Sequence, residues 1–377
     1  MIFTLEALEA KHGDSLLLHY GNKQPANLIV IDGGPAGIYN NRLRPRLEEL
    51  KEQNSPDKPL PIRMVMVSHL DDDHVNGIQA LTDDMVRKQE NEEEIPYRIA
   101  TLWHNSFDDL LNTDAINTLA ASLSSIGSSG SVKPLSQALP ASVGQGRKVR
   151  DNAQKLGLSV NTPFKGLVML PKNGKKTVSI GNGLKFTVVG PDAERADILE
   201  EEWDKQIKKL GVAKKSEKQA KAAEFVDESV FNLSSIVVLA ELGGKTMLLT
   251  GDGRGDHTIE GLRRSKLLKN GKLHVDLLKL PHHGSDRNVA TEYFRTITAD
   301  HYVVSADGRF GNPELATLKM ISEARGSEKF MIHLTNKEKR LLDFFKAEKK
   351  RGKKYDVVFR NDDELSLRVD LGDPLGP

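Results

Sequence analysis

The sequence contains no cysteine among its 377 residues. Disulfide bonds, cysteine nucleophiles and zinc sites built from thiolates are therefore excluded. The lack of cysteine also agrees with a cytoplasmic location, which we expect for this chain.

Long apolar runs and an excess of one charge are missing as well. No apolar stretch approaches the length of a membrane span, and the first residues lack a basic segment followed by an apolar one, so we expect neither a membrane segment nor a signal peptide. Lysine and arginine total 54 and aspartate and glutamate total 53, which gives a formal net charge of +1. Any attraction to nucleic acid or membrane must therefore be local.

Aromatic residues are scarce, at 5% of the sequence. Few of them accompany the two lysine-rich runs at 214–221 and 346–354, so base stacking of the single-strand kind is not indicated. Runs of charge are usually solvated surface, and the alternative for these two is contact with a phosphate backbone.

Strand-like runs alternate with helix-like segments, and four of the runs end in polar side chains. These ends lie at 69–74, 104, 252 and 282–283. The pattern is typical of an α/β fold, in which sites lie on the loops that follow strands. We expect one domain over residues 1–377, with a helical and loop insertion at about 106–228 and a C-terminal β-hairpin at about 355–370.

The stretch "VSHLDDDHVNGI" (67–78) crowds carboxylates and imidazoles directly after an apolar strand. Carboxylates this close repel one another, which indicates that a cation lies among them. Because alternate residues of an extended segment project to one side, His69 and Asp71 can share one metal ion, while Asp73 and His74 face a second. Two ions about 3.5–4 Å apart, holding a hydroxide between them, are typical of hydrolytic centres.

Three later strand ends offer the further ligands that two neighbouring ions require. Asp252 follows "LLTG", His282 and His283 stand in "LKLPHHGS", and His104 ends "TLWH". The residues alone leave open whether His282 or His283 binds metal, and whether His104 does.

The order of these motifs resembles the metallo-β-lactamase superfamily, and most of all the soluble hydrolase domain of ComEC-type DNA-uptake proteins. In that branch Asp replaces the second His of the H-x-H-x-D-H motif, as Asp71 does here. The similarity extends to "GRFGNPE" after the HHGS element and covers roughly residues 1–110 and 180–335. It implies a four-layer αβ/βα sandwich with the metal ions at one edge of its two sheets.

The resemblance also implies roles for individual residues. One metal site would use His69, Asp71 and His104, and the other would use Asp73, His74 and one of His282 and His283, with Asp252 as the bridge. The residues expected to act directly in catalysis are Asp73, Asp252 and His283. Residues considered as substrate contacts are Ser285, Lys279 and Asn312, the last standing where relatives often have His.

The cofactors expected from this ligand set are two divalent metal ions, zinc or manganese, because Asp71 adds a hard oxygen where relatives have an imidazole. The predicted activity is that of a metal-dependent hydrolase, a phosphodiesterase or nuclease acting on nucleic acid or a nucleotide. Two alternatives are an ester or lactone hydrolase on the same fold, and an effector subunit of a bacterial defence assembly that is active only with a partner. A protein partner or a homo-oligomer is left open, and no membrane partner is expected.

Overall fold

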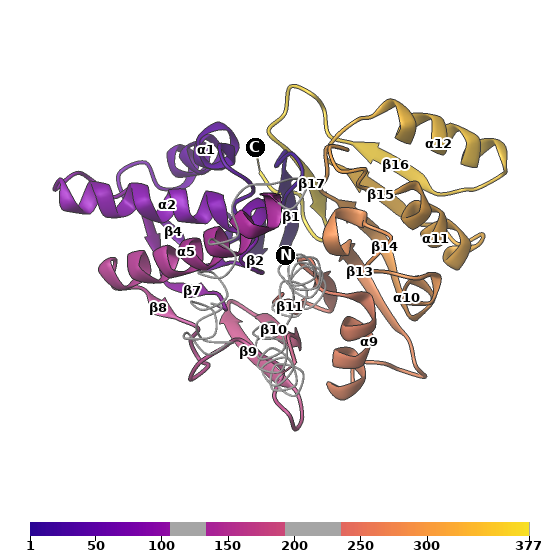
Figure 1. The fold of residues 1–377 in the computed structure, drawn as a ribbon, viewed down its shortest axis with the longest axis horizontal. Coiled ribbons are helices and arrows are strands. Elements are labelled where there is room, and N and C mark those ends of the chain that lie inside the picture. The colour runs from indigo at the N-terminus through magenta and orange to yellow at the C-terminus, as the bar shows by residue number, and fades with distance from the viewer. Residues whose placement is uncertain (106–132, 193–234, 377) are drawn as a thin grey trace, which may run out of the picture.

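The computed structural model describes residues 1–105, 133–192 and 235–376 of the chain. Two β-sheets lie face to face at its centre, and helices cover their outer faces (Figure 1). Three groups of buried apolar side chains separate the layers: one between the first sheet and its helices, one between the sheets, and one between the second sheet and its helices. This order of layers confirms the predicted four-layer αβ/βα sandwich.

Within the described ranges the first sheet has seven strands and the second has eight. The first runs in the order β17 (Ser366–Asp370), β1 (Ile2–Leu8), β2 (Leu16–Gly21), β3 (Asn27–Ile31), β5 (Met64–Met66), β7 (Thr101–Trp103) and β8 (Ser159–Val160). The second runs in the order β16 (Asp356–Phe359), β15 (Met331–Leu334), β14 (Ile297–Val304), β13 (Leu273–Lys279), β12 (Lys245–Leu249), β11 (Val237–Leu242), β10 (Leu184–Gly190) and β9 (Lys176–Gly181). A separate pair is formed by β4 (Leu60–Ile62) and β6 (Tyr97–Ile99).

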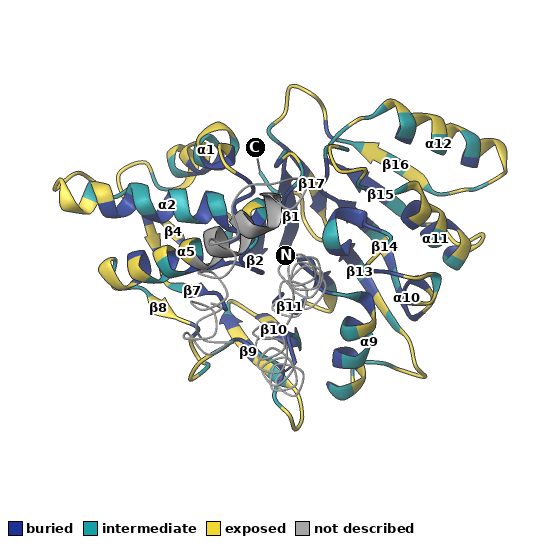
Figure 2. Ribbon diagram, in the orientation of Figure 1, coloured by how far each residue is buried: buried dark blue, intermediate teal, exposed yellow. Residues whose placement is uncertain are grey.

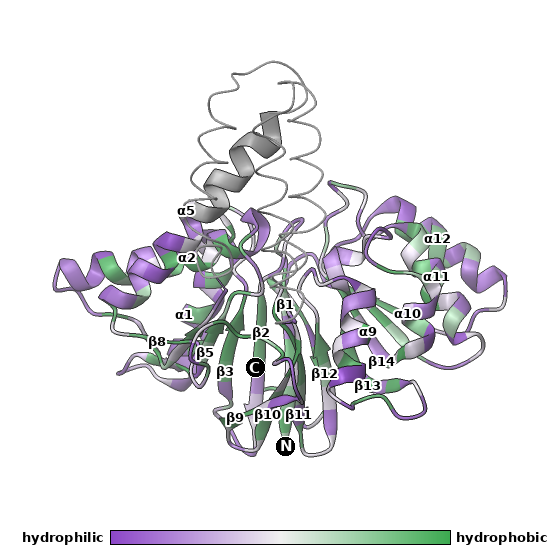
Figure 3. Cartoon of the chain, turned by 60° about the horizontal axis from the view of Figure 1, so that its bottom comes forward, coloured by the Kyte–Doolittle hydropathy of each residue, from purple (hydrophilic) through white to green (hydrophobic). Residues whose placement is uncertain are grey.

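The helices cover the outer faces of the two sheets. Those over the first sheet are α1 (Arg44–Asn54), α2 (Asp72–Glu90) and α5 (Lys133–Lys155), and those over the second are α9 (Gly255–Arg264), α10 (Thr291–Thr296), α11 (Leu315–Arg325) and α12 (Lys339–Lys350). Exposed residues gather on their outer faces and in loops, whereas the central strands are buried and hydrophobic (Figures 2 and 3). In the part of the chain that the structure describes, no helix has the length and apolar character needed to cross a bilayer.

Parallel pairing brings the carboxyl ends of several strands to one edge of the sandwich. β3, β5 and β7 run parallel in the first sheet, and β12, β13 and β14 run parallel in the second. At this edge the Ile236 N–H donates to the Ser68 carbonyl oxygen at 2.8 Å, which joins the loop after β5 to the second sheet. The four polar strand ends that the sequence marks all leave strands whose carboxyl ends lie here, so the topology can bring them together.

The start of α2 packs unusually close to the end of β3. The Gly33 N–H donates to the His74 carbonyl oxygen at 2.8 Å, and a Cβ atom on Gly77 would lie 1.9 Å from the Gly33 oxygen. Only glycine fits at this contact, which fixes the position of the first turn of α2 against the sheet.

Gly77→Ala is therefore expected to lower the free energy of unfolding by about 1–3 kcal/mol, because the added methyl group forces the helix off the strand. Urea unfolding of the metal-free protein measures this loss. Gly144→Ala in α5 is the matched control, since its Cβ would meet no atom within 4 Å. Equal stability of the Gly77 variant and the wild type would contradict the close approach.

The expected C-terminal hairpin at 355–370 is not formed. β16 pairs in parallel with β15 in the second sheet, whereas β17 pairs antiparallel with β1 in the first. The connecting segment 360–365 crosses between the sheets, and the Arg360 side chain anchors it by donating to the Thr335 carbonyl oxygen at 2.9 Å. Each of the two strands lies at the edge of a different sheet. Their closeness in sequence does not reveal this separation.

Part of the segment expected as an insertion belongs to the sandwich. Within 106–228, β9 and β10 form one edge of the second sheet, and α5 lies beside α2, where Asn152 donates to Thr82 Oγ1 at 3.1 Å. Residues 106–132 and 193–228, including the lysine-rich run 214–221, lie outside the described residues. The other lysine-rich run, 346–354, covers the end of α12 and the turn after it.

Candidate metal centre

The first turn of α2 presents His74 to the edge of the sheets. Asp32 follows β3 with a left-handed backbone (φ 57°), and its Oδ2 lies 2.9 Å from His74 Nδ1. The same carboxylate accepts hydrogen bonds from the Ser68 N–H and hydroxyl, both at 2.7 Å. A carboxylate on Nδ1 fixes the imidazole with Nδ1 protonated, which leaves Nε2 as the free ligand atom.

The two histidines after β13 sit on a strained turn. His282 (φ 48°) and His283 (φ 54°) both adopt left-handed backbone, followed by Gly284 (φ 83°). Such residues cost about 1–3 kcal/mol each and cluster at functional sites. His283 Nδ1 donates to the Ser305 carbonyl oxygen at 3.0 Å, so its Nε2 also points to the centre of the site.

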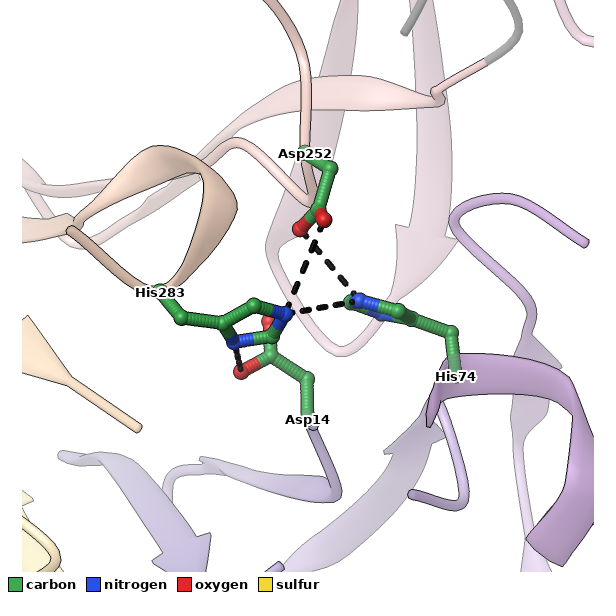
Figure 4. A group of neighbouring side chains, drawn as sticks. All are labelled: Asp14, His74, Asp252 and His283. Atoms are coloured by element: carbon green, nitrogen blue, oxygen red, sulfur yellow. Dashed lines mark hydrogen bonds and ion pairs between the residues drawn. The ribbon is translucent and has the colours of Figure 1, made fainter. Parts of the chain in front are cut away.

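Asp252 is the point where these loops converge (Figure 4). Its Oδ1 lies 3.3 Å from His74 Nε2, and its Oδ2 lies 3.6 Å from His283 Nε2. Oδ2 is also 3.7 Å from the Nε2 atoms of both His69 and His282. One buried carboxylate thus faces four imidazoles from two separate loops, and its role as a bridging ligand stays a prediction.

The ligand atoms of His74, Asp252 and His283 lie as close together as ligands of one metal ion do. Nε2 of His74 and Nε2 of His283 are 3.2 Å apart, and Asp73 lies 3.5 Å from His283 and 4.0 Å from His74. Ligand atoms bound to one tetrahedral zinc ion at about 2.0–2.2 Å lie about 3.3–3.6 Å from one another. The spacing of His74, Asp252 and His283, with Asp14 beside them, therefore fits a divalent ion, and Asp73 groups instead with His69 and His74.

A second group of possible ligand atoms lies beside the first, around His69, whose ring centroid is 4.0 Å from that of His74. His69 Nε2 is 3.4 Å from Asp71 Oδ2, and this buried nitrogen has no hydrogen-bond partner in the described residues. Asp252 Oδ1 is likewise buried without such a partner. Buried polar atoms are rarely left unpaired, so both atoms fit a site that binds a cation. The His282 side chain is 35% exposed, and its Nδ1 pairs with Asn288 Oδ1 at 2.7 Å.

The carboxylates shift the pKa values of the two buried imidazoles upward. Burial alone would lower the pKa of His283, but Asp252 and Asp14 raise it to about 10. The pKa of His74 is lowered by burial and raised more strongly by Asp252 and Asp32, to well above its ordinary value. The surrounding carboxylates therefore favour positive charge on His74 and His283. A metal ion that binds to these imidazoles would displace their protons.

The carboxylates respond in the opposite direction. Burial would raise the pKa of Asp73, but His74 and His283 lower it to about 2. Burial likewise opposes ionisation of Asp252, yet the same two imidazoles hold its pKa well below the usual range. Both side chains are thus ionised and ready to bind a cation at neutral pH.

Asp14 belongs to the same cluster, although the sequence did not single it out. Its Oδ1 lies 3.4 Å from His283 Nδ1, and its Oδ2 accepts a hydrogen bond from Lys279 Nζ at 2.5 Å. It orients His283 from behind, as Asp32 orients His74. The motif "KHGD" carries the only local signal, a carboxylate at the start of a buried strand.

The expectation that Lys279 contacts substrate is wrong for this structure. Lys279 is fully buried, and its ammonium pairs with Asp14. A buried ammonium requires a partner of opposite charge, and here that partner is a carboxylate 265 positions away in sequence.

The remaining predicted residues lie near the same edge. The Val67 N–H bonds to the Trp103 carbonyl oxygen at 2.8 Å, so buried His104 leaves β7 beside the 67–74 loop, and its role as a ligand stays a prediction. Ser285 Oγ accepts the Arg287 N–H at 3.4 Å, a local turn bond. Asn312 Nδ2 donates to the His282 carbonyl oxygen at 3.5 Å, which places it beside the site.

A cavity of about 810 Å³ lies elsewhere in the fold. It is lined by residues at the amino end of β3, by Leu60–Arg63 and by the end of α1. Asp32 follows the opposite, carboxyl end of β3, so this cavity is separate from the metal centre.

No protein-family model and no curated protein matches the chain. Among the solved structures similar to it are three that each share 12% sequence identity with the chain. A proposed metal-dependent hydrolase from Parabacteroides distasonis matches 94% of this chain and 92% of its own, with a TM-score of 0.34. A point mutant of the β-hydroxylase CmlA matches 98% and 54% (TM-score 0.39), and zinc-bound PqqB from Methylobacterium extorquens matches 95% and 87% (TM-score 0.37). Similarities of this size carry no conclusion about activity.

Proposed function

We propose that the chain is a metal-dependent hydrolase that cleaves phosphodiesters in nucleic acid or a nucleotide. The observation that carries the proposal is the convergence of His69, His74, His282 and His283 on the buried carboxylate of Asp252. The resemblance to the ComEC branch, through "SHLDDDH", "LLTGD" and "LPHHGS", supports a phosphodiester as substrate.

Two sets of residues would hold two divalent ions, zinc or manganese. Asp73, His74, His283 and Asp252 form one set, and His69, Asp71 and Asp252 form the other, with His282 and His104 as further candidates. Two such ions, when bound, supply Lewis acidity and lower the pKa of a coordinated water. Asp32 and Asp14 keep the Nε2 atoms of His74 and His283 directed at the centre, so the ligands need little rearrangement.

Hydrolysis of bis-p-nitrophenyl phosphate by protein loaded with manganese or zinc tests the proposal. We expect turnover that disappears with a chelator and returns when the metal is restored. Activity on p-nitrophenyl acetate or lactones alone would reject the phosphodiesterase in favour of an ester hydrolase. A metal-loaded protein that is inactive on all of these until a partner protein is added would instead indicate a conditionally active subunit.

The metal preference gives a further prediction at Asp71. Asp71→His is expected to keep metal binding and to raise the ratio of zinc-supported to manganese-supported activity, because imidazole is a softer ligand than carboxylate. Activity measured after loading with each metal gives the ratio. Asp72→His, at the exposed neighbouring position, is the matched control and should keep the wild-type ratio. An unchanged ratio in the Asp71 variant would count against Asp71 as a ligand.

A further inference from the structure

Phe310 is the most exposed large apolar side chain among the described residues. It is 68% exposed, while the next, Leu342, is 47% exposed. Single exposed apolar residues are ordinary on protein surfaces. Phe310 differs in its neighbours: the Arg309 guanidinium lies 5.5 Å from its ring centroid, and the His12 ring meets it edge-on with centroids 5.1 Å apart.

The loop that carries Phe310 borders the metal centre. It connects β14 to α11, and two residues after Phe310 the Asn312 side chain donates to the His282 carbonyl oxygen at 3.5 Å. At the start of the loop, the Ser305 carbonyl oxygen accepts a hydrogen bond from His283 Nδ1 at 3.0 Å. The loop that carries Phe310 is thus bonded to His282 through Asn312 and to His283 through Ser305.

His12 reaches the same centre from the first sheet. The Asp14 N–H, two residues later, donates to the Asp73 carbonyl oxygen at 3.2 Å, and Ser305 Oγ donates to the Gly13 carbonyl oxygen at 2.6 Å. The segments that carry His12 and Phe310 are therefore bonded to each other and to the α2 turn that bears Asp73.

We propose that Phe310, with Arg309 and His12, forms a platform that binds a planar aromatic group of the substrate, a nucleobase beside the scissile phosphate. This inference rests on the proposed phosphodiesterase function and narrows it to substrates that carry a base. An exposed ring stacks on a base of any sequence, and the guanidinium attracts the adjoining phosphate. Because stacking on a single aromatic ring does not distinguish one base from another, we expect nucleotides to bind without strong base preference.

Two diesters with the same leaving group test the platform: thymidine 5′-(p-nitrophenyl phosphate) and methyl p-nitrophenyl phosphate. Phe310→Ala should raise the ratio of KM for the thymidine diester to KM for the methyl diester by about tenfold. Phe310→Tyr should restore the ratio, because tyrosine keeps the ring. Leu342→Ala, which removes an exposed apolar side chain from α12, is the matched control and should leave the ratio unchanged.

An unchanged ratio in Phe310→Ala, with both diesters still hydrolysed, overturns the platform and leaves the proposed function standing. If the wild-type protein hydrolyses neither diester, the proposed function fails, and calorimetric titration with thymidine 5′-monophosphate decides on the platform. A dissociation constant about tenfold higher in Phe310→Ala than in wild type then supports it, and equal constants reject it.

Discussion

Asp252→Asn is expected to lower turnover by more than about a hundredfold and to reduce the metal content of the purified protein. Loss of residues that only orient ligands already costs about 10–100-fold in such centres, and Asp252 lies at the centre of the ligand set itself. Its two oxygens lie 3.3 Å from His74 and 3.6 Å from His283, and no other carboxylate of the described residues is within 4 Å of four imidazoles. An amide of the same shape keeps the packing but removes the negative charge that the proposed bridging role requires.

Metal content by mass spectrometry and turnover of bis-p-nitrophenyl phosphate measure both effects. Asp256→Asn, in the first turn of α9 four residues later, is a matched control: its carboxylate is 60% exposed and pairs with Arg254. We expect the control to retain metal and activity. Wild-type metal content and turnover in Asp252→Asn would rule out its bridging role.

His74→Ala is expected to produce a second large loss, again more than about a hundredfold in turnover. His74 Nε2 is within 3.3 Å of both Asp252 and His283, and its Nδ1 is held by Asp32. Without the imidazole, Asp32, Asp73 and Asp252 are left as neighbouring carboxylates with one fewer cationic or metal-bound group between them. The metal-free variant is therefore also expected to unfold at lower temperature than the metal-free wild type.

Thermal unfolding and activity after metal loading check this result. His274→Ala is the matched control, because His274 lies at the opposite end of β13 with its side chain 54% exposed. Near wild-type turnover in His74→Ala would show that His74 is not a required metal ligand. It would also contradict the proposal that α2 and Asp252 bind the same ion.

The predictions that the sequence supported well concern features visible within one segment. An apolar strand followed by "SHLDDDH" and a helical pattern fixes both the end of β5 and the start of α2, and it places His69, Asp71, Asp73 and His74 on one loop. The layer order follows from the alternation of strands and helices together with the resemblance. The convergence of 69–74 with 252 and 282–283 follows from parallel pairing in both sheets, whose strands end at the same edge of the sandwich.

The errors and omissions concern partners that lie far apart in sequence. The short strand of 366–370 pairs with β1 across the whole chain, so its local pattern could not separate a hairpin from a sheet edge. Lys279 and Asp14 form an ion pair although they lie 265 positions apart in sequence. Asp32 stands in a clear local motif, the Asp-Gly-Gly that follows β3. Its contact with His74, however, depends on the position of α2, which the sequence alone does not reveal.

The choice between His282 and His283 was open in the sequence because adjacent residues share the same local pattern. The left-handed turn directs both rings toward Asp252, but they differ in burial and in their Nδ1 partners. His283 is buried with Ser305 and Asp14 behind it, as is usual for a metal ligand. His282 is partly exposed, which suits either a ligand of the ion proposed beside His69 or a contact to substrate.

Anomalous diffraction from crystals of the metal-loaded protein, recorded at the zinc or manganese absorption edge, tests the central claim most directly. We predict two peaks on either side of the Asp252 carboxylate, one bound by His74 and His283 and the other by His69. An ion elsewhere in the fold, or none within coordination distance of Asp252, would contradict the account.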